Sequence, residues 1–266
     1  MEEQYTRSNG KAGQIKMETN VIYVLWLRDM KRFVRAKSRI IGMLMLPILF
    51  LLGLGLGLNG LVHLSSGSYL EFVVPGIIGM SLLFTSISSG TAVLWDRQFG
   101  FLKEIMVTPN SRTSVVIGRM LGGATTAMLQ SIIIVVISLL IGFVIHFSLL
   151  NIFALVFMFL TAATFISIGL VFGSIINDFQ GFQLVTNFVT MPLFFLSNGI
   201  FPLSSLPTFV QYISYINPLT YGVDGLRGTL TGSSTFPIIL DFIMLLISLI
   251  ITISIASYAF KRTEVG

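Results

Sequence analysis

Residues 236–260 read FPIILDFIMLLISLIITISIASYAF and are followed directly by Lys261 and Arg262. A run of this length can cross a hydrocarbon core of about 30 Å as a helix. The whole chain is 54% hydrophobic and 10% charged, whereas soluble domains carry about 25% charged residues. Because the apolar residues are continuous rather than alternating, the pattern predicts an all-α membrane protein and excludes a β-barrel.

Five further apolar runs lie upstream, so we predict one membrane domain, residues 1–266, with six transmembrane helices. Residues 1–14 are polar and are predicted to be disordered. Residues 15–39 are predicted to form an amphipathic helix in the membrane interface, because apolar side chains follow helical spacing and basic side chains share another face. The six-span bundle covers 40–260, with spans at 40–60, 72–94, 115–145, 149–176, 181–198 and 236–260.

The positive charges predict the orientation of these spans. Nine of the 16 Lys and Arg residues precede the first span, four lie around the break at 95–114, and two follow the last span. Positive residues concentrate on the cytoplasmic side of membrane proteins. We therefore expect a multi-pass plasma-membrane protein with both termini in the cytoplasm and with the segment 199–235 outside.

The outer segment 199–235 is too apolar for a free loop and too often interrupted by proline for a span. We expect a re-entrant helical hairpin between spans five and six, packed into the outer mouth of the bundle; an ordinary folded outer loop is the alternative. Asp224 and Arg227 are three residues apart, so they are expected to pair on one helical face in a structural role, with substrate binding as the alternative. Gly53 and Gly57 fit the small-xxx-small pattern of close helix packing, or else face lipid.

The polar break at 95–112 reads WDRQFGFLKEIMVTPNSR. Large apolar residues at 101, 102, 105 and 106 can form one helical face among charges of both signs, and Pro109 ends that helix. A plain connecting loop is the alternative. A short surface helix with this composition is typical of an element that docks into a partner protein.

Here the sequence resembles the permease subunits of ATP-binding cassette exporters of the second type, which include drug-resistance permeases such as the daunorubicin-resistance permease. The motifs that carry the resemblance are Asp96-Arg97-x-x-Gly100-x-Leu102-x-Glu104, Thr108-Pro109, Ser111-Arg112, Asn198-Gly-Ile-Phe-Pro202, Leu206-Pro207, and Asn217-Pro218-Leu-Thr-Tyr221 with Asp224 and Arg227. The resemblance covers nearly the whole chain. It departs from the family at Gln98 and Phe99, where Glu and a small residue are common.

The resemblance implies that 95–112 is the coupling helix, with Phe101, Leu102, Lys103 and Glu104 in or near the contact with a cassette ATPase subunit. It also implies a re-entrant helical pair before the last span, a prokaryotic plasma membrane, and an assembly of two cassettes with two permease copies, as a homodimer or a heterodimer. The chain has no G-x-x-x-x-G-K-[ST] phosphate loop. We therefore expect it to bind no cofactor, with ATP and Mg used by the partner subunit.

These observations predict export of an apolar or amphipathic substrate, such as a drug, an antibiotic or a lipid-like molecule. Export of a lipid-linked polysaccharide or teichoic-acid-type glycan is the alternative, and a non-transporting membrane scaffold is a more distant one. No enzyme signature is present. Without cysteine, and with only His63 and His146 near span ends, no metal site is expected. The positive charges flank spans and are expected to meet membrane lipids rather than nucleic acid.

Overall fold

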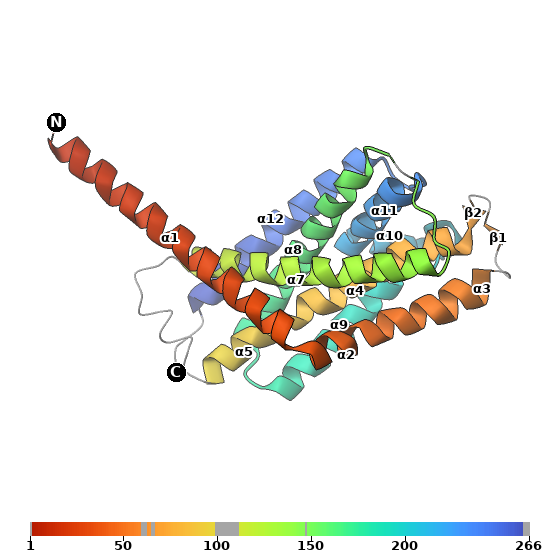
Figure 1. The fold of residues 1–266 in the computed structure, drawn as a ribbon, viewed down its shortest axis with the longest axis horizontal. Helices are drawn as coiled ribbons and strands as arrows, with labels where there is room; N and C mark the ends of the chain where they lie inside the picture. The colour runs from red at the N-terminus through yellow and green to blue at the C-terminus, as the bar shows by residue number, and fades with distance from the viewer. Residues whose placement is uncertain (1, 60–62, 65–66, 99–111, 147, 263–266) are drawn as a thin grey trace.

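The computed structural model describes residues 2–59, 63–64, 67–98, 112–146 and 148–262 (Figure 1). They form a helical bundle with one antiparallel hairpin of two-residue strands, β1 (His63–Leu64) and β2 (Gly67–Ser68). The helices are α1 (Glu2–Arg35), α2 (Lys37–Phe50), the π-helix Leu51–Leu56, α3 (Gly57–Asn59), α4 (Tyr69–Ser88), α5 (Thr91–Gln98), α7 (Arg112–Leu140), α8 (Asn151–Ile175), α9 (Phe179–Phe195), the 3-10 helix Leu203–Ser205, α10 (Thr208–Ile216), α11 (Pro218–Thr231) and α12 (Ile238–Arg262).

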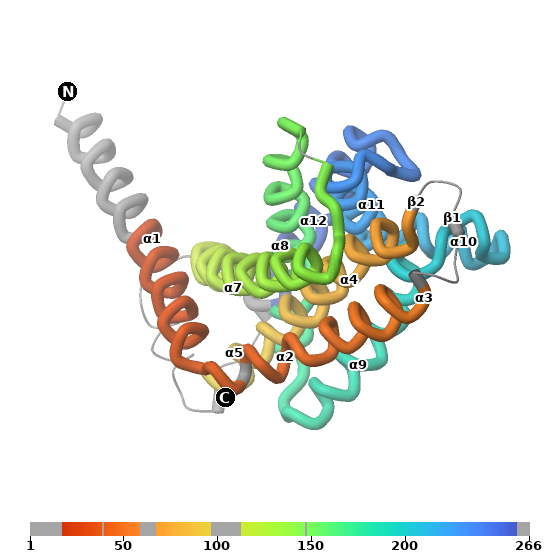
Figure 2. Tube along the Cα trace, turned by 45° about the vertical axis from the view of Figure 1, so that its right-hand side comes forward, coloured from red at the N-terminus to blue at the C-terminus, as the bar shows by residue number. Residues whose placement is uncertain are grey.

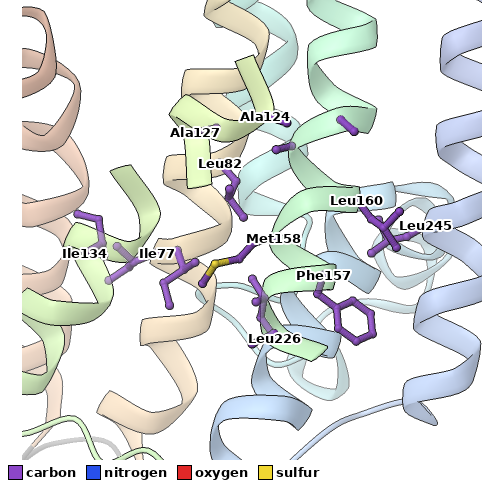
Figure 3. Packing of buried hydrophobic residues seen from close by; sticks show 14 of the residues in the cluster. Ile77, Leu82, Ala124, Ala127, Ile134, Phe157, Met158, Leu160, Leu226 and Leu245 are labelled. Carbon is purple, nitrogen blue, oxygen red and sulfur yellow. The ribbon is translucent and has the colours of Figure 1, made fainter. Parts of the chain in front are cut away.

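Helix α4 is the centre of the bundle, with α2, α7, α8, α9 and α11 packed around it. It begins after Ser68, whose side chain accepts a hydrogen bond from the Leu70 N–H at 3.2 Å. The shared core lies between α4, α7, α8, α11 and α12 (Figure 3), and includes Ile77, Ala124, Phe157, Leu226 and Leu245. The hairpin β1–β2 lies at one end of the bundle and α5 at the other (Figures 1 and 2), and these are called the hairpin end and the α5 end below.

Four helical stretches among the described residues are long and apolar enough to cross a membrane: Tyr69–Asp96, Thr113–Leu140, Asn151–Ile175 and Ile238–Ala259. A fifth candidate is the bent pair Glu18–Arg35 and Ile40–Leu56, whose two halves meet at 73°. Helix α9 has 17 residues, too few for the same test. The predicted helical class is therefore confirmed, with four or five candidate spans among the described residues, while the six-span count stays a prediction.

The ends of several elements differ from the sequence prediction. Helix α1 begins at Glu2, so it includes residues predicted to be disordered; no proline interrupts them. The predicted interfacial helix breaks at Ala36, which has φ −93° and ψ 58°. The predicted span 115–145 ends as a helix at Leu140, because Gly142 then takes φ +106° and turns the chain.

Two short helices form the predicted re-entrant segment. Pro207 precedes α10, Pro218 begins α11, and the Asn217 side chain accepts a hydrogen bond from the Leu219 N–H at 3.0 Å. Gly232 ends α11 in the left-handed conformation, with φ +75°, a common stop for a helix. Most of α11 is buried, whereas α10 exposes large apolar side chains such as Phe209. The position of this pair relative to a membrane stays a prediction.

Gly53 and Gly57 make no close helix contacts among the described residues, so the alternative, that they face lipid, stays open. A Cβ added at either glycine would meet no described atom within 4 Å. Close backbone contacts occur elsewhere: a Cβ at Gly76 would lie 2.1 Å from the Gly199 carbonyl oxygen, and one at Gly90 would lie 2.0 Å from that of Gly169. Gly76 therefore lets α4 approach the segment that follows α9, and Gly90 lets the chain just after α4 approach α8.

Candidate functional site

The predicted docking segment begins in α5, and most of it lies outside the described residues. Asp96 and Arg97 occupy the last turns of α5. The other predicted contact residues fall within 99–111, which the structure does not describe: Gly100, Phe101, Leu102, Lys103, Glu104, Thr108 and Pro109. The coupling helix itself therefore stays a prediction, but the elements on both sides of it, α5 and α7, are described.

Asp96 joins three helices at the α5 end. Its side chain is largely buried and accepts hydrogen bonds from the guanidinium groups of Arg119 on α7 and of Arg28 on α1, the latter at 3.2 Å. Arg119 is 3% exposed. Removing either member of a buried ion pair destabilises the fold, because the other charge is then buried without a partner. Residues on either side of the predicted docking segment are therefore tied to each other and to the amphipathic helix.

Helix α1 packs closely on α7 through two glycines spaced four apart. A Cβ at Gly118 would lie 3.1 Å from the Ile22 Cα, and one at Gly122 would lie 2.7 Å from a carboxylate oxygen of Asp29. This spacing places both glycines on one face of α7, where small residues let two helices approach. The Trp26 indole N–H adds a hydrogen bond of 3.1 Å to the Thr125 hydroxyl.

A cleft of about 80 Å³ opens between α7 and the junction of α1 with α2, and we call it the α7 cleft. One wall is a stripe of α7, and the other walls come from α1, α2, α4, α8 and the chain at Ala92. The lining includes Asp29, Arg32, Phe33, Ala36, Ile40, Met43, Thr85, Ser89, Arg119, Gly123, Thr126 and Gln130. Asp29 lies on α1, outside the predicted spans, and burial raises the pKa of its carboxyl, although Arg119 and Arg28 oppose that rise.

A second hollow, of about 670 Å³, lies beside α5. It is lined by Trp95 and Asp96 of α5, by Ala36, and by the basic residues Arg28, Lys31, Arg32 and Arg35 of α1. The Trp95 ring packs against Phe179 of α9, with 4.8 Å between ring centroids. The hollow is thus strongly basic and adjoins the start of the predicted docking segment.

At the hairpin end, Asp224 and Arg227 pair as predicted, with Nη1 3.3 Å from the carboxylate. The interaction is buried rather than exposed: Asp224 is 0% and Arg227 3% exposed. Asp224 also accepts hydrogen bonds from the backbone N–H groups of Thr235 and Phe236, both at 2.8 Å. Arg227 donates to the Phe72 carbonyl at 3.1 Å and to the Asn198 carbonyl at 2.6 Å. The pair therefore connects α11 to α4 and to the residues just before α12.

Of the other predicted residues of the outer segment, Asn198 contacts this pair directly. Asn198 has φ +60° just after α9, and its amide donates to Thr235 at 3.0 Å. The Tyr221 hydroxyl donates to the Tyr215 carbonyl at 2.6 Å, and Pro202 immediately precedes the 3-10 helix. Asp241 lies in the first turn of α12 and is fully buried, and its carboxylate oxygens have no hydrogen-bond partner among the described residues.

Sequence reasoning missed the residues around the α7 cleft. Arg28 and Arg119 were interpreted only as orientation signals, and Asp29 and Gln130 were not singled out. A signal was present, because Arg119, Gly123, Thr126 and Gln130 are spaced four, three and four apart. That spacing is one stripe of a helix, and a stripe of polar and small residues within an apolar run indicates a face turned away from lipid.

Comparisons with known proteins agree on one family. Residues 20–231 match the family model described as ABC-2 type transporter. The chain is 26% identical to the inner membrane transport permease YadH of Escherichia coli K12 over 230 residues, 85% of this chain and 89% of YadH. It is also 26% identical to nodulation protein J of Rhizobium leguminosarum bv. viciae over 242 residues, 90% of this chain and 93% of that protein. This chain belongs to the ABC-2 type transporter family, as a transport permease rather than a catalytic subunit.

Proposed function

We propose that this chain is the membrane-spanning subunit of an ATP-driven exporter whose cassette ATPase is a separate polypeptide. Family membership supports a transport permease, and the absence of a phosphate loop from the sequence requires another source of ATP hydrolysis. ATP and Mg are bound by the cassette subunit. The observation that carries the proposal further is the Asp96 network, which connects α5 and α7, the helices on either side of residues 99–111, to α1.

In this proposal the α5 end faces the cytoplasm, because the basic hollow, lined by four basic residues of α1, lies there. The chain crosses the membrane six times, with the stretch from α2 to α3 as the first span and α9 as the fifth. Reporters check this orientation: a fusion after Lys261 reads cytoplasmic, and one inserted at Ser205 reads external. The reverse pattern overturns the topology.

The coupling step follows from the contacts of Asp96. When ATP closes the two cassettes, the coupling helix at 96–108 that they hold moves, and Asp96 carries that movement to α1 and α7 through Arg28 and Arg119. ATP can drive transport only if the two permease states differ in their contacts with the loaded cassettes. The rigid attachment of α1 to α7 at Gly118 and Gly122 makes them move together.

Two permease copies, identical or related, assemble with two cassettes, and the substrate passes along the interface between the copies. The cargo is an apolar or amphipathic molecule. The same architecture serves lipid-linked glycans, so a transport panel that contains a drug, an amphipathic lipid and a polyprenyl-linked glycan separates these cargo classes.

The docking role is tested by replacing Leu102 and Glu104 together with alanine in the permease co-expressed with its cassette subunit. We expect the variant to insert normally but to lose cassette co-purification and coupled export. The matched control is Phe209→Ala, which removes an exposed apolar side chain at the hairpin end. Unchanged co-purification and export in the double variant contradict the docking proposal.

A further inference from the structure

Two buried polar side chains of the α7 cleft lack the hydrogen bonds that burial normally demands. Arg119 is 3% exposed, and its Nε and Nη1 have no hydrogen-bond partner among the described residues. Gln130 is 1% exposed, and neither its amide nitrogen nor its amide oxygen has a described partner. Both residues line the cleft. Leaving such groups unpaired costs about 1–3 kcal/mol each, so a ligand that supplies the missing bonds is strongly favoured.

The cleft is elongated along α7. Arg119 and Gln130 are 11 residues apart, which separates them by about 16 Å along a helix of 1.5 Å per residue. Gly123 and Thr126 lie between them on the same stripe. A ligand in this cleft therefore extends from the α5 end toward the middle of the bundle.

Some walls of the α7 cleft are polar and others are apolar. Thr85 and Ser89 face the cleft from α4 and its end, while Phe33, Ile40 and Met43 contribute apolar surface from α1 and α2. Such a lining, with few polar groups among apolar side chains, is typical of sites for amphipathic small molecules. It accommodates an alkyl chain better than it does a fully hydrated ion.

The charge at the α5 end of the cleft favours an anion. Three guanidinium groups, from Arg28, Arg32 and Arg119, face two carboxylates, from Asp29 and Asp96. One positive charge is left over. The unpartnered Nε and Nη1 of Arg119 are two of the donors through which arginine binds phosphate or carboxylate oxygens in pairs.

We propose that the α7 cleft binds an amphipathic molecule with an oxyanion head, of the phosphate or carboxylate class. Arg119 holds the head, the apolar wall holds the chain, and Gln130 pairs with an ester, amide or hydroxyl group farther along the molecule. The claim that this molecule is the exported cargo rests on the proposed export function. The claim that the α7 cleft binds it does not.

Binding is measured on the full-length permease without its cassette, in phosphatidylcholine nanodiscs, with radiolabelled dodecyl phosphate as the probe. We expect saturable binding that excess dodecyl phosphate displaces, and that equal concentrations of dodecanol or inorganic phosphate do not. Displacement by inorganic phosphate alone assigns the cleft to a free anion and overturns the proposal, as does displacement by dodecanol or a failure to saturate.

Two variants locate the site. Gln130→Met and Arg119→Lys each remove unpartnered donors, and lysine keeps the positive charge beside Asp96; each should raise the Kd roughly tenfold, the usual effect of losing a hydrogen bond to a charged or buried group. Ser131→Ala is the control, because its buried hydroxyl is also unpartnered among the described residues but does not line the cleft. It should leave the Kd unchanged.

Thermal unfolding separates binding from folding. Gln130→Met removes an unsatisfied buried amide, so its midpoint should equal or exceed that of the wild type while its affinity falls. Wild-type affinity in both variants overturns the site. Binding as expected, but without stimulation of ATP hydrolysis in the reconstituted complex and without export of dodecyl phosphate, refutes this cargo and leaves the site intact.

Discussion

Removing the Asp96 carboxylate should destabilise the α5 end far more than removing an ordinary surface charge. Asp96→Ala leaves the buried guanidinium of Arg119 without its carboxylate partner. Losing one member of a buried ion pair costs about 3–5 kcal/mol. The second interaction, with the partly exposed Arg28, adds at most about 1 kcal/mol. Asp29 lies near enough to attract Arg119 and to compensate in part, so we expect a loss of about 3 kcal/mol.

A double-mutant cycle with Arg119→Met isolates this interaction. The methionine removes the stranded charge but keeps an apolar chain, so Asp96→Ala with Arg119→Met should be more stable than Asp96→Ala alone. We expect a coupling energy of about 2 kcal/mol, within the range for residues in direct contact. The assay is reversible unfolding of the permease in detergent micelles, paired with cassette-dependent ATP hydrolysis. Additivity of the two substitutions within about 0.5 kcal/mol would show that Asp96 and Arg119 do not act as a pair.

Three further substitutions follow from the packing. Gly122→Ala should lower the unfolding midpoint, because its Cβ would lie 2.7 Å from an Asp29 carboxylate oxygen and must push α1 away from α7; an unchanged midpoint contradicts this contact. Asp224→Asn should cost about 3 kcal/mol or more, because it strands the buried Arg227 and turns an amide toward backbone N–H groups; the check is protease resistance of the hairpin end, which should fall. Gly53→Ala should be neutral or stabilising by up to about 1 kcal/mol, since no described atom lies within 4 Å of the added Cβ, and a clear loss of thermal stability would place a partner there.

The sequence predicted the helical class and the paired motif at Asp224 and Arg227 because both depend on local spacing. An apolar run of sufficient length has few alternatives to a membrane helix, and residues three apart on a helix are neighbours wherever that helix lies. Burial of the pair could not be predicted, since it depends on the carbonyl groups of Phe72 and Asn198, which come from other parts of the chain.

The Asp96 network and the α7 cleft could not be predicted for the same reason. Asp96 meets Arg28 and Arg119, which lie 68 and 23 residues away along the chain. Membrane orientation alone accounts for charges that flank apolar runs. The sequence therefore offers no reason to expect that these charges also pair with one another in the packed structure. Gly118 and Gly122 have the same four-residue spacing as Gly53 and Gly57, so the sequence does not distinguish the two pairs. The packing of α1 on α7 does, because of these four glycines it involves only Gly118 and Gly122.

The least buried of the four long helices is also the most apolar. Within its most apolar stretch, α12 is only 17% buried inside the bundle, against 83% for the stretch Tyr69–Asp96. Lipid requires only that a side chain be apolar, whereas a protein neighbour also constrains its shape. A library of substitutions should therefore find α12 tolerant of exchanges among Leu, Ile, Val and Phe, and α4 intolerant of them. The substitution-tolerant helix is also the one outside the family match, which covers residues 20–231 and ends before α12 begins.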